Sequence, residues 1–410
     1  MRYSPKRASG VGEFCEMKKV LVPTNIRSIM GKVQIKLVST DRDMTQFVEF
    51  SNELYRGCPY YVPDLNVDIR NTFDPKTNSA LEFTDIQAFL AVDENGRTLG
   101  RIAGIINRLA NQKWNTKTVR FGFIDFVDDE SVSEALINAA IDWGRQRGMD
   151  VIQGPMGIFD FDKEGMLVED FDKPNSMITI YNYPYYPKHL ERLGFQKAVD
   201  WLQVRIDIPE EVPPKYKRVA DMSKELFGLR VKKLTDAEIK AGYGKRVFRL
   251  LNEAYSALFG YTELTDKQID EYVDRYMSLI DKQMVPVIEN EKGETVGVAI
   301  TMCSLNDALQ KSGGKLLPLG WYHLLKSLKW KHEDHAELLL IAVRPDYQGL
   351  GVNALFFDDL IPVFRKMKLA WAETGPQLES NVKELSQWKP MKPTLYKRRR
   401  CYRKQLGMRN

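Results

Sequence analysis

The chain carries the same order of predicted elements twice, and this repetition constrains its fold more than any other feature. In each half, the spacing of apolar residues predicts a strand, a helix, three strands, a helix, a strand, a helix and a final strand. Strands interleaved with helices in this order indicate a mixed α/β sheet with helices on both faces. We therefore expect two tandem α/β domains of one architecture, which 410 residues are enough to form.

The predicted domain boundaries follow from shifts in composition. Residues 1–31 are basic, contain Gly, Ser and Pro, and lack a long apolar run, so we expect a disordered extension there. The first domain should span 32–209, and the charged segment 210–228, which contains two prolines, suggests a linker. The second domain should span 229–410 and contain an insert at 306–333.

Composition also excludes several classes of protein. The four cysteines lie far apart, so neither a disulfide framework nor a zinc site is indicated, and no metal is expected. No window approaches the roughly 20 apolar residues that a membrane-spanning helix needs. We therefore expect a cytoplasmic protein, and contact with the inner face of the membrane is the alternative.

One stretch, AVRPDYQGLGVNALFF (342–357), links an apolar strand to a helix through a loop with two glycines. Glycines allow the backbone to turn there, and the start of a helix offers unpaired N–H groups to an anion. Such a loop could cradle a diphosphate, while the strand edge before it could bond the amides of an extended ligand arm. Coenzyme A has both parts. The predicted cofactor-binding residues are Ile341, Ala342, Val343, Gln348, Gly349, Leu350, Gly351, Val352 and Asn353.

The segment AELLLIAVRPDYQGLGVNALF (336–356) resembles the acyl-CoA-binding motif of the GNAT (Gcn5-related N-acetyltransferase) superfamily. Val343, Pro345, Gln348 and Gly351 match the motif, and Asn353 stands where Gly or Ala is usual. The overall layout resembles the long bacterial double-GNAT proteins, a group that includes bacterial ceramide synthase-like acyltransferases. The segments that carry this second likeness are GPMGIFDFDKEGMLVEDFDKP (154–174) and YNYPYYPKHLERLGF (181–195).

The first domain should be a degenerate copy. At the position of the glycine loop it has Asp128, Asp129 and Glu130 before the helix. Carboxylates suit the start of a helix but repel a diphosphate. We therefore expect acyl-CoA to bind to the second domain alone.

The resemblance implies an acyl-CoA-dependent N-acyltransferase in which an amine attacks the thioester directly. Family members often use a strand carboxylate as the base, which leaves Glu337, Glu373 and the neighbouring His335 as alternatives. Tyr396 resembles the family's general acid, and Asn381 matches an asparagine that contacts the pantetheine arm. A non-catalytic double-GNAT module that binds acyl-CoA, a membrane or a protein remains the alternative function.

Three further segments bear on the partners. The acidic loop 160–165, with the aromatic segment 181–186 beyond it, could contact a cationic amine acceptor. The segment 314–331 places leucines and Trp321 on one helical face between lysines, a pattern typical of helices that lie on membranes or pack on their own domain. The basic run 397–404 has no accompanying recognition motif, so nucleic acid is not expected as a partner.

Overall fold

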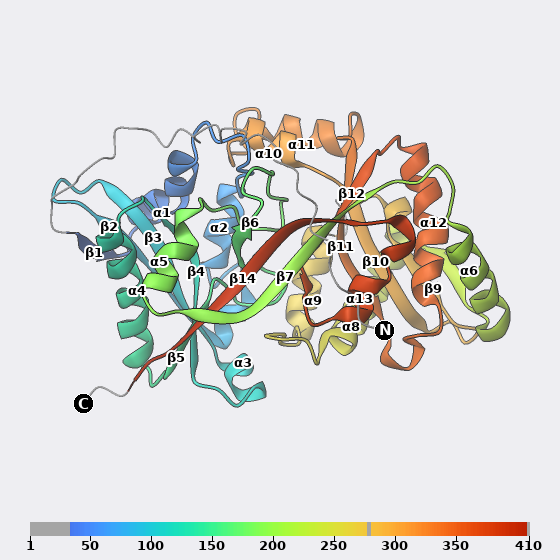
Figure 1. Ribbon diagram of the computed structural model, residues 1–410, viewed down its shortest axis with the longest axis horizontal. Coiled ribbons are helices and arrows are strands. Elements are labelled where there is room, and N and C mark those ends of the chain that lie inside the picture. The colour runs from blue at the N-terminus through green and yellow to red at the C-terminus, as the bar shows by residue number, and fades with distance from the viewer. Residues whose placement is uncertain (1–32, 277–279, 408–410) are drawn as a thin grey trace, which may run out of the picture.

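One continuous sheet of fourteen strands runs through the computed structural model, which describes residues 33–276 and 280–407 (Figure 1). The strand order is β1-β2-β3-β4-β5-β14-β7-β12-β11-β10-β9-β8, with β13 beside β7 and β6 beside β14. The mixed α/β architecture predicted from the sequence is confirmed. The predicted extension at 1–31 lies outside the described residues.

The elements have the following bounds. The strands are β1 (Gln34–Leu37), β2 (Thr84–Val92), β3 (Thr98–Asn107), β4 (Thr118–Phe126), β5 (Val151–Gly154), β6 (Met166–Glu169), β7 (Gln196–Asp207), β8 (Arg230–Lys233), β9 (Pro286–Glu289), β10 (Thr295–Cys303), β11 (His335–Val343), β12 (Trp371–Thr374), β13 (Gln377–Leu378) and β14 (Thr394–Gln405). The helices are α1 (Asp41–Leu54), α2 (Asn66–Thr72), α3 (Arg108–Lys113), α4 (Glu130–Arg145), α5 (Tyr185–Arg192), α6 (Pro214–Phe227), α7 (Asp236–Glu238), α8 (Gly244–Tyr255), α9 (Asp266–Tyr276), α10 (Asn306–Ser312), α11 (Gly320–Lys329), α12 (Val352–Lys366) and α13 (Val382–Ser386).

The two halves exchange their final strands. Strand β7, which closes the first half in sequence, pairs with β12 of the second half. Strand β14, which closes the second half, pairs with β5 and β6 of the first. The two exchanged strands also pair with each other along most of their length, and Figure 1 shows them crossing diagonally between the halves. The sequence boundary at 209 therefore does not separate two sheets.

The segment expected to be a linker instead contains helix α6. Its two prolines stand at the start of this helix, where a missing N–H is harmless and a fixed φ favours the first turn. Gly228 ends it in the left-handed conformation. The side chains of Tyr216 and Ala220 pack α6 onto the same hydrophobic core as α12.

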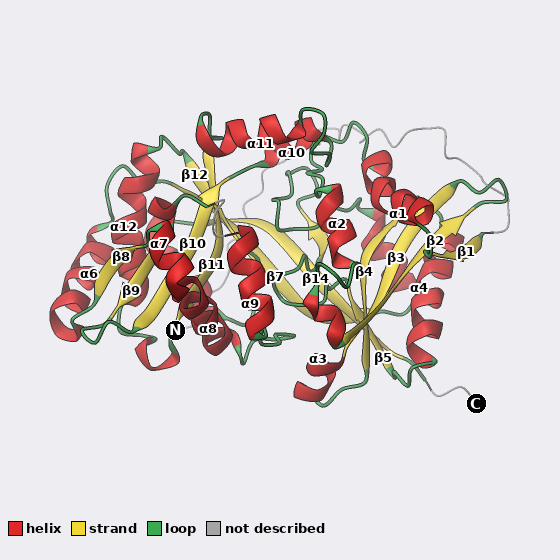
Figure 2. Ribbon diagram, turned by 180° about the vertical axis from the view of Figure 1, so that it is seen from behind, coloured by secondary structure: helices red, strands yellow, loops and turns green. Residues whose placement is uncertain are grey.

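Helices cover both faces of the sheet in the second half (Figure 2). Helices α6 and α12 pack on one face, while α8 and α9 pack on the other. The core on the α8 side also contains Phe47, Val48 and Ile158 of the first half, so the two halves share it. No helix of the described part of the chain is long and apolar enough to cross a membrane.

Candidate active site

A cavity of about 940 Å³ lies between the two halves, and residues of both halves line it. The second half contributes residues 338–341 of β11 and the inner side of α11. The first half contributes the loops 156–164 and 177–181. Leu, Ile, Phe and Met side chains form much of the wall, as in most sites for small molecules.

Strand β11 leaves its neighbour β12 in the middle of the cavity wall. The two strands pair in parallel only as far as Leu338 and Thr374. Against β10, the register of β11 skips Leu339, which forms a β-bulge. Beyond it, the hydroxyl of Tyr255 donates to the main-chain oxygen of Ile341 at 2.9 Å and accepts from its N–H at 3.2 Å. Tyr255 thus occupies main-chain groups to which the amides of an extended ligand would bond.

The predicted phosphate loop has the conformation that its glycines suggest. Gly349 and Gly351 have φ values of 85° and 84°, which other residues seldom adopt. Helix α12 begins at Val352, and no side chain of the described residues caps it. Gln348 donates its side-chain amide to the main-chain oxygen of Val343 at 3.1 Å. An uncapped helix start therefore lies directly after the free edge of β11.

Two asparagines predicted to bind the cofactor hold the short helix α13 in place. Asn353 donates to the side chain of Gln387 at 2.7 Å, which ties the start of α12 to the end of α13. Asn381 lines the cavity and accepts the N–H of Glu384 at 3.3 Å. Of the other residues in this group, Ala342 and Val352 are buried and Leu350 is partly exposed.

In the first half, a carboxylate side chain caps the start of the equivalent helix. Asp129 accepts the N–H of Ser131 at 2.8 Å and so caps α4. A carboxylate that already bonds this N–H would repel a phosphate there. This geometry agrees with the expectation that the first half is degenerate.

The four residues predicted to be catalytic do not line the cavity. His335 stacks on Trp371 with ring centroids 4.1 Å apart, and burial lowers its pKa. Tyr396 packs edge-on against the same indole at 5.7 Å, and burial raises its pKa to about 12. Glu337 and Glu373 face each other across β11 and β12 and are buried. Their roles as base and acid stay predictions that this geometry does not favour.

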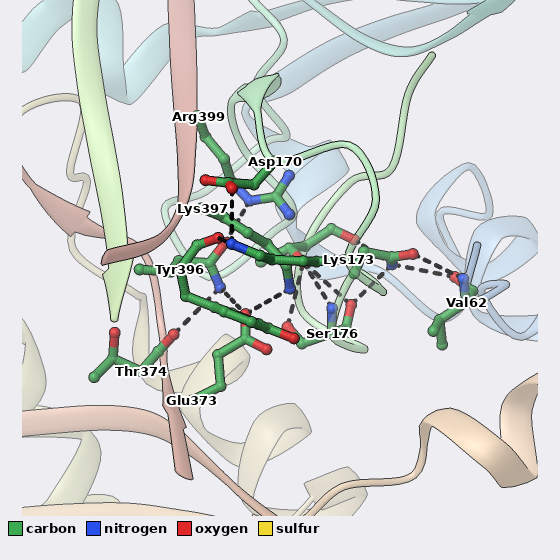
Figure 3. A network of polar contacts seen from close by, with 12 residues as sticks. Val62, Asp170, Lys173, Ser176, Glu373, Thr374, Tyr396, Lys397 and Arg399 are labelled. Atoms are coloured by element: carbon green, nitrogen blue, oxygen red, sulfur yellow. Dashed lines mark hydrogen bonds and ion pairs between the residues drawn. The ribbon is translucent and has the colours of Figure 1, made fainter. Parts of the chain in front are cut away.

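Glu373 belongs to a buried polar network that joins β12 to the exchanged strands (Figure 3). Its carboxylate accepts from Lys397 of β14 at 2.8 Å and from Gln203 of β7 at 2.6 Å. Arg399 donates to Gln203 at 2.7 Å and also to the main-chain oxygen of Ile180, which lines the cavity. Both cations are fully buried, and this burial lowers the pKa of Lys397 and lowers that of Arg399 to about 10.

Glu337 lies beside this network without taking part in it. Neither of its carboxylate oxygens has a hydrogen-bond partner among the described residues. Burial, and then the charge of Glu373, raise the pKa of Glu337 to about 8. A buried acid with no partner costs stability, and such costs are common at functional sites.

We expect Glu337→Gln to stabilise the protein at pH 8 but not at pH 5. Because the folded pKa lies above the unfolded value, the wild type loses stability as the pH rises from about 4.5 to about 8. Glutamine removes this loss, so the gain should reach about 4 kcal/mol at pH 8. Denaturant unfolding at both pH values measures this gain in the free energy of unfolding.

Glu373→Gln should instead destabilise the protein, because it removes the charge that pairs with Lys397. Equal effects of the two variants on the free energy of unfolding would contradict this account.

Two carboxylates that do line the cavity were not singled out as catalytic from the sequence. Burial raises the pKa of Asp160 to about 6 and that of Glu384 to about 7. Both charges also contribute to raising the pKa of Tyr255, which lines the same cavity. The acidic loop around Asp160 was recognised as a possible contact for an amine. Glu384 lies in a five-residue helix with no motif, and no local signal could have indicated it.

Two curated proteins are similar to the chain over most of its length. No protein-family model matches the chain. Protein YghO of Escherichia coli (strain K12) is 27% identical over 390 residues, covering 93% of this chain and 97% of that protein. A bacterial ceramide synthase of Caulobacter vibrioides is 29% identical over 316 residues, covering 76% and 80%.

Solved structures define the class of fold. A tandem GNAT protein from the clavulanic acid biosynthesis pathway superposes with a TM-score of 0.53 at 12% identity, covering 92% of this chain and 100% of that one. The chain therefore has the tandem GNAT fold, and the resemblance noted in the sequence is confirmed at that level.

Proposed function

We propose that the protein is an N-acyltransferase that transfers an acyl group from acyl-CoA to an amine bound in the cavity between its halves. The observation that carries this proposal is the continuity of one cavity. It reaches from the free edge of β11, through Ile341, to the carboxylates of Asp160 and Glu384. The tandem GNAT fold supports the same reaction class.

The acyl donor would bind to the second half. Its diphosphate would accept hydrogen bonds from N–H groups within the loop 348–353, and its amide-containing arm would replace the Tyr255 hydroxyl at Ile341. Asn381, at the cavity wall, would contact the same arm. The residues present therefore suit a ligand with one anionic end and an extended polar arm.

The acceptor would enter the apolar part of the cavity with its amine toward the acidic loop. Asp160, Asp162 and Glu164 all line the cavity there, and carboxylates attract an ammonium group. The relative named as a bacterial ceramide synthase supports an amine that carries a long aliphatic chain. The apolar side chains of the wall fit such a chain.

Catalysis would require deprotonation of the amine and polarisation of the thioester. The amine nitrogen forms a bond to the carbonyl carbon while the carbon–sulfur bond breaks, and CoA leaves as a thiolate that takes a proton from water. A different main-chain N–H group of the β11 edge, beside the bulge at Leu339, would donate to the carbonyl oxygen. Glu384, with a pKa near 7, would accept the proton lost from nitrogen.

The test measures the release of free thiol from acyl-CoA donors, from acetyl- to palmitoyl-CoA, with amines that include a sphingoid base. It compares the wild type with the variants Gly349→Asp and Gly349→Asn. Gly349 has open space around it and a φ of +85°, so Asp and Asn carry the same backbone cost. Only the Asp variant places a negative charge in the loop, where it would repel the diphosphate. We expect it to raise the KM for acyl-CoA roughly tenfold to a hundredfold over the Asn variant.

Two results would overturn the proposal. If the wild type binds CoA but releases no thiol in response to any amine, the protein is a binding module and not a transferase. Equal affinity of the Asp and Asn variants for CoA would show that the loop does not hold the diphosphate.

A further inference from the structure

Helix α11 and the turn before it present apolar side chains to solvent. Leu317, Leu319 and Trp330 are 76%, 61% and 67% exposed. Four more large apolar residues of the same segment are exposed as well: Leu316, Trp321, Tyr322 and Leu325. Scattered apolar residues are common on protein surfaces, but seven within fifteen positions form a patch that calls for a ligand or partner.

The same segment forms part of the cavity wall. Leu324 and Leu328 line the cavity from the inner side of α11. Leu316, Trp321 and Leu325 both line the cavity and reach solvent. These three residues therefore stand at a mouth of the cavity, and the apolar surface continues from the outside into the interior.

The charged side chains within this segment are all positive. Residues 308–332 contain five lysines and neither Asp nor Glu. Lys326, Lys329 and Lys331 form no ion pair with any other described residue, and Lys326 lies over the ring of Tyr322. Apolar side chains flanked by lysines are the pattern of a surface that binds anionic lipid headgroups.

Contacts with the first half hold this segment in place. Gln310 donates to the main-chain oxygens of Pro59 and Tyr61 at 3.0 and 3.1 Å. Lys315 forms an ion pair with Glu49 at 2.9 Å. Figure 1 shows α10 and α11 lying along one edge of the molecule above the junction of the halves. The patch is therefore presented outward by a fixed element.

We propose that α11 docks on an anionic lipid bilayer and that the cavity mouth beside it admits an aliphatic substrate directly from that bilayer. The second part rests on the proposed function, whereas the docking does not. A bilayer is the occupant that the observations favour, because it supplies apolar chains and anionic headgroups together. It would also explain why the exposed patch and the cavity wall are continuous.

Sedimentation with vesicles tests the docking. The wild type should pellet with vesicles of phosphatidylcholine and phosphatidylglycerol, and less with phosphatidylcholine alone or at high salt. The triple variant Leu317→Ser, Leu319→Ser, Trp330→Ser changes side chains outside the cavity wall, so the cavity is left intact. We expect it to bind at least about tenfold more weakly while keeping the wild-type melting temperature and rate on acetyl-CoA with a water-soluble amine.

The matched control is Met222→Ser with Leu226→Ser, which changes exposed apolar residues of α6 and should bind vesicles like the wild type. The docking would be overturned if the triple variant bound vesicles as tightly as the wild type does, or if the wild type did not bind vesicles at all. The docking would also be overturned if the wild type formed a dimer instead of binding vesicles and the triple variant were a monomer. Vesicle binding without thiol release would contradict the proposed reaction alone, and thiol release in solution without vesicle binding would contradict the docking alone.

Discussion

Glu384→Gln should lower kcat/KM for amine acylation by about a hundredfold to ten-thousandfold, the usual contribution of a general base. Glutamine keeps the shape and the cavity contacts but cannot accept a proton. Because Glu384 must be ionised and its pKa is about 7, the wild-type rate should rise with pH through about 7. The variant should lose this rise and keep only the one at higher pH that reflects deprotonation of the free amine. Rates measured over this pH range give both quantities.

Glu379→Gln is the control for this experiment. Glu379 precedes the same helix, pairs with Lys197, and lies outside the cavity wall. Its replacement should leave the rate and the pH profile unchanged. If Glu384→Gln keeps the pH dependence near 7 while Glu337→Gln loses it, the base is the strand carboxylate that the family resemblance implied.

Lys397→Met should lower the free energy of unfolding by about 3–5 kcal/mol, the cost of breaking a buried ion pair. Lys397 is fully buried, and its ammonium lies 2.8 Å from Glu373. Methionine fills the space but leaves the carboxylate of Glu373, next to Glu337, with Gln203 as its only hydrogen-bond donor among the described residues. Denaturant unfolding measures the loss.

Lys404→Met, on the same strand, provides the comparison. Lys404 is partly exposed and bonds the main-chain oxygen of Leu193 at 2.8 Å, so its replacement should cost about 1 kcal/mol or less. Adding Glu373→Met to Lys397→Met removes both charges and should restore most of the lost stability. A loss below about 1 kcal/mol in Lys397→Met would show that the pair contributes little.

Features with a local cause could be predicted from the sequence. The conformation of Gly349 and Gly351 depends on what a glycine backbone alone can do, and the structure has positive φ at both. The acid cap of Asp129 depends on a side chain two residues from the N–H that it bonds. The amphipathic pattern of 314–331 likewise indicated a helix, and α11 occupies ten of those residues.

Features that depend on distant segments could not be predicted. The alternation within β7 and β14 is satisfied equally well in either half, so nothing local shows that the strands exchange. The prolines of α6 were interpreted as a linker because Pro-Pro begins both linkers and helices. Glu384 becomes significant only where α13 meets the cavity that Tyr255 of α8 also lines.

The position of β14 in the sheet bears on how the protein is made. A ribosome releases this strand after the thirteen other strands that the structure describes, yet it takes a place between β5 and β7, at the centre of the sheet. Until then, the edges of both neighbours are exposed, and exposed strand edges invite pairing with other chains. The nascent protein therefore depends on its final strand to close the sheet, and the period before that closure is when a chaperone would have most to protect.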